Sequence, residues 1–138
     1  MTLKVKYDPE AFPMTRAYPT DAGLDIRTPS DFILWPGGRA CIDTGIHVQI
    51  PPGYCGRITS KSGLMRDKGI TSEGLIDANF IGSINAVLFN NTNKIVRFER
   101  GQKITQLVIQ PCETPDLDVV DELEETDRGG NGFGSTGR

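Results

Sequence analysis

Several features that are common in chains of this length are scarce here. No stretch of the 138 residues repeats apolar side chains at the i, i+3, i+4, i+7 spacing of an amphipathic helix. Sixteen glycines and nine prolines interrupt the sequence at short intervals, which favours short strands and turns. The length suffices for one compact domain with a core but not for two. We therefore expect one domain with one system of sites.

Long apolar runs and a basic excess are also missing. No eighteen apolar residues stand together, and the start MTLKVKYDPE lacks the apolar stretch of a signal peptide. Fifteen basic against eighteen acidic residues give a net charge of −3 without a Lys/Arg block, which argues against a nucleic acid as main ligand. The sequence thus predicts a cytoplasmic protein with no membrane and no nucleic-acid partner.

Cysteine use is equally sparse. Cys41, Cys55 and Cys112 are odd in number, form no C-x-x-C pair, and have only His47 to complete a metal set. We expect ordinary reduced thiols.

What remains between the glycines and prolines is a series of short β-branched, partly alternating runs, typical of strands. An all-β antiparallel sandwich or jelly roll follows from them. Turns are expected at PPG (51–53) and NNTN (90–93), and one short helix at 63–69, where LMRDK lacks β-branching. The predicted strands lie at residues 3–7, 40–50, 54–60, 74–80, 83–90, 94–98, 103–110 and 116–120.

The composition changes after Val120. The segment DELEETDRGGNGFGSTGR offers only Leu123 and Phe133 as large apolar side chains, so it cannot form a core. We divide the chain into a barrel-like body, 1–120, and a flexible glycine-rich arm, 121–138. Such an end is either a floppy terminus or a lid, in which Phe133 stacks on a planar base while other arm groups bind phosphate oxygens. The phosphate-binding groups of the lid would be Ser135, Thr136, main-chain N–H groups and Arg128.

Two further segments suit phosphate chemistry. SKSG at 60–63 brings a hydroxyl, a cation and a glycine together before the expected helix, although the same residues occur in ordinary turns. Asp77 follows two apolar residues inside an apparent strand, where a carboxylate is either a turn or capping group or one with a chemical role.

Five segments, in this order, resemble the five motifs of the trimeric dUTPase family, including its phage members. They span nearly the whole chain: AGLDI (22–26), GRITSKSG (56–63), GLIDANFIG (74–82), GQKITQLVI (101–109) and RGGNGFGSTG (128–137). The resemblance implies hydrolysis of dUTP to dUMP and pyrophosphate, which limits uracil incorporation into DNA and supplies dUMP for dTMP synthesis. A phage member would act in the host cytoplasm.

The resemblance also assigns the reacting groups. Asp77 would be the general base that activates a water for attack on the α-phosphorus. Phe80, where most relatives have Tyr, would pack on the deoxyribose and exclude a 2′-hydroxyl; alone it would pass for a core aromatic. Main-chain groups in the third-motif hairpin would bind the uracil, at Gly74, Leu75, Ile76 and Asn85. No Asn precedes Gly74, where this chain has Glu73, so a polar contact that the resemblance implies is either absent or replaced.

Phosphates would be bound by the second, fourth and fifth motifs. Gln106, otherwise a polar strand residue, and Ser62 have neutral donors for the phosphate chain of a neighbouring subunit's substrate. Mg²⁺ would be held by the phosphates and waters, with Asp25 behind those waters. The resemblance further implies a homotrimer whose sites each draw on three chains. Besides the residues of the third motif, the substrate-binding set implied by the resemblance comprises Lys61, Ser62, Gly63, Gln106, Arg128, Phe133, Gly134, Ser135 and Thr136.

Three departures from the family pattern stand out: Lys61 replaces an Arg, Gln102 an Asp, and Asn131 a Gly. The first two changes are linked if the usual residues touch one another. Two alternatives remain to dUTP hydrolysis. A dCTP deaminase needs a Glu on the strand after the hairpin, where this chain has Val87. A non-catalytic regulator of the same fold would bind a partner and release no pyrophosphate.

Overall fold

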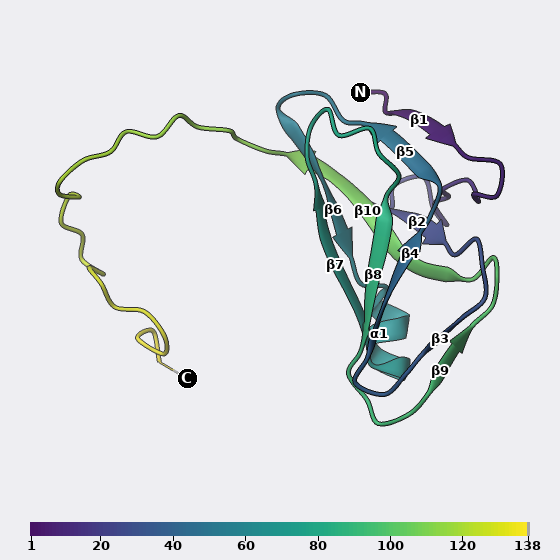
Figure 1. Cartoon of the computed structure of the whole chain (residues 1–138). Coiled ribbons are helices and arrows are strands. Elements are labelled where there is room, and N and C mark those ends of the chain that lie inside the picture. The colour runs from purple at the N-terminus through teal and green to yellow at the C-terminus, as the bar shows by residue number, and fades with distance from the viewer. Residues whose placement is uncertain (138) are drawn as a thin grey trace.

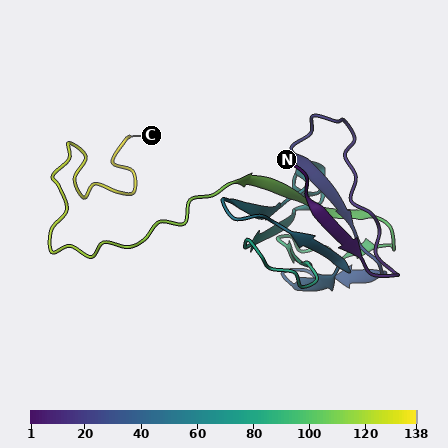
Figure 2. The ribbon, with the colours of Figure 1, turned by 90° about the horizontal axis from the view of Figure 1, so that it is seen from above.

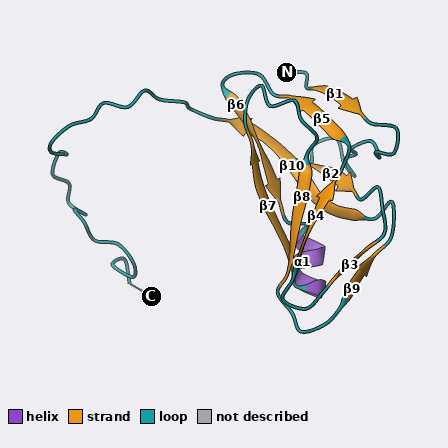
Figure 3. Ribbon diagram, in the orientation of Figure 1, coloured by secondary structure: helices purple, strands orange, loops and turns teal. Residues whose placement is uncertain are grey.

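The computed structural model describes residues 1–137, which form an all-β body with one short helix (Figures 1 and 3). The jelly-roll-like β architecture expected from the sequence is confirmed. The strands are β1 (Lys4–Tyr7), β2 (Gly23–Arg27), β3 (Phe32–Leu34), β4 (Arg39–Asp43), β5 (Ile46–Gln49), β6 (Tyr54–Thr59), β7 (Ile70–Ile76), β8 (Asn85–Asn90), β9 (Val96–Phe98) and β10 (Lys103–Pro111), and the helix is α1 (Ser62–Lys68).

The main sheet is curled and has six strands in the order β2-β10-β6-β7-β8-β4. Its long strand β10 pairs antiparallel with β2 on one side and β6 on the other. Two smaller ribbons, β1-β5 and β3-β9, close the body at its edges. The phenyl rings of Phe32 and Phe98 stack across the second ribbon with centroids 4.7 Å apart.

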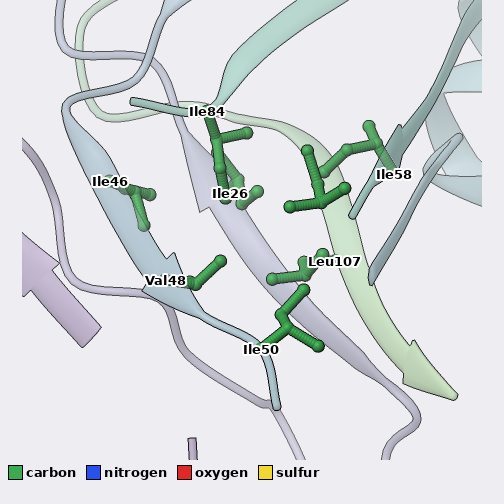
Figure 4. Packing of buried hydrophobic residues seen from close by; sticks show 8 residues of the cluster. Ile26, Ile46, Val48, Ile50, Ile58, Ile84 and Leu107 are labelled. Carbon is green, nitrogen blue, oxygen red and sulfur yellow. The ribbon is translucent and has the colours of Figure 1, made fainter. Parts of the chain in front are cut away.

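Isoleucine dominates the buried interior, because β-branched side chains fit the pleated faces of strands. One cluster joins β2, β5, β6 and β10, and Figure 4 shows its side chains converging between the strands. A second lies toward α1 and the β3-β9 ribbon. The first cluster contains Ile26, Ile46, Val48, Ile50, Ile58, Ile76, Ile84 and Leu107, and the second Leu34, Ile42, Ile70, Ala86, Leu88, Phe98 and Ile104.

Most of the expected local structure is present. The turn at 51–53 joins β5 to β6 with Gly53 at φ 89°, a value that favours glycine. Helix α1 lies where the short helix was expected and ends at Gly69, whose φ is 65° and whose N–H bonds back to the helix. The expected strand 40–50 is two strands, because the chain turns at Gly45 (φ 68°).

One expected strand is absent. Residues 116–120 form no strand; β10 ends at Pro111 and the chain beyond it is exposed coil. Both ribbon views show this segment running away from the body (Figures 1 and 2). The flexibility of the arm, and the division at residue 120, stay predictions. Among residues 1–137, no helix is long and apolar enough to span a membrane.

Candidate active site

The hairpin formed by β7 and β8 opens part of the way along its length. The two strands pair with each other only from Ile70↔Asn90 to Ser72↔Leu88. Beyond that point β7 pairs with β6 through residues 73–76, whereas β8 pairs with β4 as far as Asn85↔Asp43. The facing edges, which include Gly74, Leu75 and Ile76 on one arm and Asn85 on the other, therefore share no ladder pairs. Main-chain donors and acceptors in such a gap are available to a ligand.

Asp77 lies at the mouth of this opening, directly after β7. Its side chain is exposed and forms no ion pair within residues 1–137. The following turn is fixed by main-chain bonds: the Asn79 amide donates to the Ile50 carbonyl at 3.1 Å, and the Phe80 amide to the Asp77 carbonyl at 3.2 Å. Asn79 has φ 66°, which Asn tolerates better than most residues. The carboxylate is thus displayed to solvent on a defined turn.

Phe80 stands three residues further on, and its ring packs over Gly82. A β-carbon on Gly82 would lie 2.6 Å from the ring Cζ, so any side chain there would displace the ring. The phenyl group is still 46% exposed. Phe80 belongs to the same turn as Asp77, and the exposed face of its ring is available for stacking.

A second group of polar side chains lies on β2 and near the start of β10, away from the open hairpin. Asp25 on β2 is almost fully buried, and its two carboxylate oxygens receive Lys61 and Lys103. The Lys103 Nζ lies 2.7 Å from Oδ2. Burial raises the pKa of Asp25, but the hydrogen bonds and ion pairs from Lys103 and Lys61 outweigh it, so the pKa lies below its ordinary value. Two ammonium groups against one carboxylate leave the cluster with a net positive charge.

Gln106 and the start of α1 complete this cationic cluster. Gln106 lies between Asp25 on β2 and Thr59 on β6, packs against Gly23, and donates from Nε2 to the Ser60 carbonyl at 2.9 Å. Ser62 and Gly63 are exposed in the first turn of α1. The second and fourth motifs are therefore adjacent.

The open hairpin and the cationic cluster do not meet within one chain. The Ser60 hydroxyl oxygen accepts from the Ser72 amide at 2.9 Å, and Asp77 stands five residues further along the same chain direction. At about 3.3 Å per strand residue, this separation is roughly 16 Å. One copy of the chain presents both groups, but at separate positions.

The side chains of Lys61 and Gln102 have different partners in this chain, and the suggested link between these two departures stays a prediction. Lys61 pairs with Asp25, whereas the Gln102 Oε1 accepts from the Glu99 amide at 2.6 Å. The two side chains have separate partners because Gln102 caps the turn that leads into β10. Lys103, which the sequence reasoning passed over, is the second cation on Asp25; its place beside Gln102 in the fourth motif was the available signal.

The arm residues are remote from both groups. Phe133 is fully exposed, and the contacts of Arg128 and Ser135 are local: Arg128 Nε and the Ser135 hydroxyl both donate to the Asn131 carbonyl, at 2.9 and 3.2 Å. The segment that leads from β10 to the arm, by contrast, begins near the hairpin, at Cys112. The pKa of the Cys112 thiol is raised, first by its hydrogen bond with Cys55 and also by nearby charge that includes Asp77. All three cysteines are free thiols, as expected.

His47 entered the sequence reasoning only as a possible metal ligand, and its contacts in the fold were not foreseen. Its Nδ1 lies 2.8 Å from the Ile81 carbonyl oxygen and its Nε2 lies 3.1 Å from Asp8 Oδ2. The bond to the Ile81 carbonyl and the Asp8 carboxylate raise the pKa of His47. It therefore ties the N-terminal segment to the turn that carries Asp77 and Phe80. Nothing in the sequence signalled it, because both partners are far away along the chain.

The fold and these groups define an all-β protein with an open hairpin beside a free carboxylate and a separate cationic cluster. The family model "dUTPase" matches residues 10–137. A dUTP nucleotidohydrolase of Paramecium bursaria Chlorella virus 1 is 43% identical over 84% of this chain and 83% of its own length. That of Anaeromyxobacter is 42% identical over 88% and 86%. The chain belongs to the dUTPase family.

Solved structures agree. The dUTPase of Staphylococcus bacteriophage 80alpha with dUPNHPP superposes with a TM-score of 0.92 at 34% identity, over 99% of both chains. The likeness therefore includes phage members of the family.

Proposed function

We propose that this chain hydrolyses dUTP to dUMP and pyrophosphate, and thereby limits uracil in DNA and supplies dUMP. The observation that carries the proposal is the opening of the β7-β8 hairpin next to the exposed Asp77. It combines a row of unpaired main-chain groups with a carboxylate free to accept a proton. The dUTP nucleotidohydrolases named above supply the activity by family membership.

Base and sugar fit the open hairpin. Main-chain groups of Gly74, Leu75, Ile76 and Asn85 offer donors and acceptors at fixed positions, which match the edge of uracil and leave the amino group of cytosine unpaired. Phe80, held against Gly82, provides the face on which the deoxyribose packs. The same ring leaves no room for a 2′-hydroxyl, and the tyrosine hydroxyl of relatives is not needed for this exclusion.

The phosphate chain requires a second copy. Lys61, Ser62, Gly63 and Gln106 lie too far from Asp77 in their own chain to reach the phosphates of the same substrate. A homotrimer solves this, because the cationic cluster of one copy can face the hairpin of the next. The arm of a third copy closes the site with Arg128, Phe133, Gly134, Ser135 and Thr136, of which Phe133 stacks on the base and the others bind phosphate.

Asp77 acts as the general base in this arrangement. Its carboxylate orients a water and accepts a proton as the water oxygen attacks the α-phosphorus. The bond from the α-phosphorus to the oxygen that bridges to the β-phosphorus then breaks, and pyrophosphate is released. Lys61 and Gln106 stabilise the negative charge of the phosphates, and the closed arm excludes bulk water.

The residues present fit Mg²⁺ held chiefly by phosphates and water. Residues 1–137 contain no cluster of three or more His, Cys, Asp or Glu side chains suited to a metal. Asp25 is the buried carboxylate nearest to the phosphate-binding residues and would contact the ion through waters. When bound, the ion would neutralise phosphate charge. A structure of a phage phi11 dUTPase variant is described as showing the coordination of a structural Mg(II) ion.

The deciding experiment is pyrophosphate release from dUTP, UTP, dCTP and dTTP at equal concentration. We expect dUTP to be hydrolysed with strong preference. Comparable release from dCTP or UTP would contradict the assignment of the base and sugar sites.

A regulatory role is the second candidate. Phage dUTPases, among them that of Staphylococcus bacteriophage 80alpha, control transfer of virulence genes. A protein that serves only as a binding module would release no pyrophosphate from any of the four nucleotides.

A further inference from the structure

Charge is distributed unevenly along this chain. After Pro111 there are eight acidic and two basic residues, so residues 112–138 carry a net charge of −6. The remaining ten acidic and thirteen basic residues give residues 1–111 a net charge of +3. Five of the acidic residues lie within seven positions, at Asp121, Glu122, Glu124, Glu125 and Asp127. None of these five forms an ion pair within the part of the chain that the structure describes.

The body concentrates positive charge in one hollow. A groove of about 700 Å³ runs between α1, the turn after β8, and β9, and is lined by Arg66, Lys68, Lys94 and Arg97. Asp67 also lines it but is engaged by Arg66, whose Nε lies 2.7 Å from Oδ1. Within residues 1–137, the other three cations have no ion pair. We call this hollow the α1 groove.

The groove also offers an apolar contact. Ile95 lines it and is 46% exposed. In the acidic segment, Leu123 is 87% exposed and stands between Glu122 and Glu124. A segment with negative charges on both sides of one leucine therefore complements a groove with cations around one isoleucine.

The arm is positioned to reach another copy rather than its own groove. The segment that leads from β10 to the arm is fixed at its start, where the Cys112 amide donates to the Gly53 carbonyl at 2.9 Å. This point lies at the opposite end of β6 from α1. Residues 113–120 are exposed and contain no glycine, so a sharp reversal there is unfavourable. They can span about 26 Å in extended form. In both ribbon views the arm leads away from its own body (Figures 1 and 2).

We propose that the acidic segment, residues 121–127, of one copy docks into the α1 groove of a second copy. The α1 groove is lined by residues of α1, the helix that begins at Ser62 next to Lys61, and by Gln102, the neighbour of Lys103. A docked segment therefore holds residues 128–136 close to the phosphate-binding cluster of the copy it touches. This inference rests on the proposed assembly and arm closure, and it adds a contact that forms without nucleotide.

The test is hydrogen exchange of residues 121–127 in the nucleotide-free protein. At low ionic strength we expect exchange roughly fivefold to tenfold slower than in a free peptide, since several exposed charge pairs act together. The protection should vanish near 1 M salt, where screening extends over only about 3 Å. The groove variant Lys94→Glu/Arg97→Glu should abolish it at low salt, and so should the arm variant Glu124→Lys/Glu125→Lys. Combining the two variants should restore protection.

The matched control is Lys4→Glu/Lys6→Glu on exposed β1, which makes the same change of net charge away from the groove and should leave protection unchanged. Equal loss in the control, or no recovery in the combined variant, would overturn the proposal. Hydrogen exchange is measured without nucleotide, so the docking of the acidic segment can be confirmed or refuted whether or not the protein hydrolyses dUTP.

A cross-linking experiment decides which copy is involved. Assemblies that mix ¹⁴N- and ¹⁵N-labelled chains would be treated with a carbodiimide, which joins a lysine amine to a carboxylate as an amide with loss of water. Links from Lys68 or Lys94 to Glu124 or Glu125 should include pairs of mixed label. Links confined to single-label pairs would place the arm in its own groove and refute docking on a second copy.

A double-mutant cycle excludes the substrate as the occupant of the groove. Groove reversal should weaken binding of dUpNHpp in the wild-type background but not in Glu124→Gln/Glu125→Gln. Equal weakening in both backgrounds would show that the groove binds the nucleotide and not the arm.

Discussion

Replacing Asp77 by Asn separates catalysis from folding, because the side chain is exposed, forms no ion pair within residues 1–137 and lies outside the strand ladder. The amide has the same shape but cannot accept the proton of the attacking water. Loss of a general base costs about 10²- to 10⁴-fold in rate, which corresponds to about 2.7–5.4 kcal/mol at 1.36 kcal/mol per tenfold. The free energy of unfolding should change by no more than about 0.5 kcal/mol.

The assay is single-turnover release of pyrophosphate, with dUpNHpp binding and thermal unfolding measured on the same preparations. The matched control is Glu73→Gln, which removes one exposed carboxylate from β7 and should retain activity. Turnover by Asp77→Asn within a few-fold of the unmutated protein would remove Asp77 from its role. A large loss of stability would instead show that the turn depends on the carboxylate.

Four further predictions concern Phe80, the arm, His47 and Asp25. The unmutated protein should reject UTP, and Phe80→Ala should relax that rejection in a competition assay; comparable UTP and dUTP rates without mutation would refute it. Hydrogen exchange of residues 128–137 should slow with dUpNHpp and Mg²⁺ but little with dUMP, and equal exchange in all states would refute the lid. The folded pKa of His47 is raised above 6.5, so its stabilisation should be complete below pH 6.5 and lost as pH rises through the folded value; thermal unfolding of His47→Gln should lack this dependence. Asp25→Asn should raise the Mg²⁺ concentration required for half-maximal activity, and an unchanged requirement would exclude the indirect contact.

Local patterns predicted much of the body. The β-branched runs identified β6 and β10, and the residues of 63–69 identified α1, because propensity and burial agree there. The strand expected at 116–120 is wrong although its residues alternate, since no neighbouring strand of the same chain is present to pair with it. β-propensity reports a suitable surface and not a partner.

The candidate site was predictable only as separate pieces. The sequence placed Gln106 on a strand, but it also put Asp77 inside a strand at 74–80, whereas β7 ends at Ile76 and Asp77 lies in the turn that follows. The pairing of Lys103 with Asp25 depends on the register between β10 and β2. The contact of His47 with Ile81 likewise depends on tertiary packing. Such contacts join residues that are distant along the chain, which no local spacing encodes.

The parting of β7 and β8 has a mechanical consequence. The two strands of the hairpin are held by different outer strands, β7 by β6 and β8 by β4. The width of the gap between β7 and β8 is therefore set by the outer strands. A β-carbon on Gly56 of β6 would lie 2.8 Å from Ile50 Cδ1 and 3.2 Å from Ile76 Cβ, and would push the β7 arm aside. Drift in nucleobase preference should therefore arise through core substitutions that never touch the ligand, whereas exchange of side chains at the rim should alter it little.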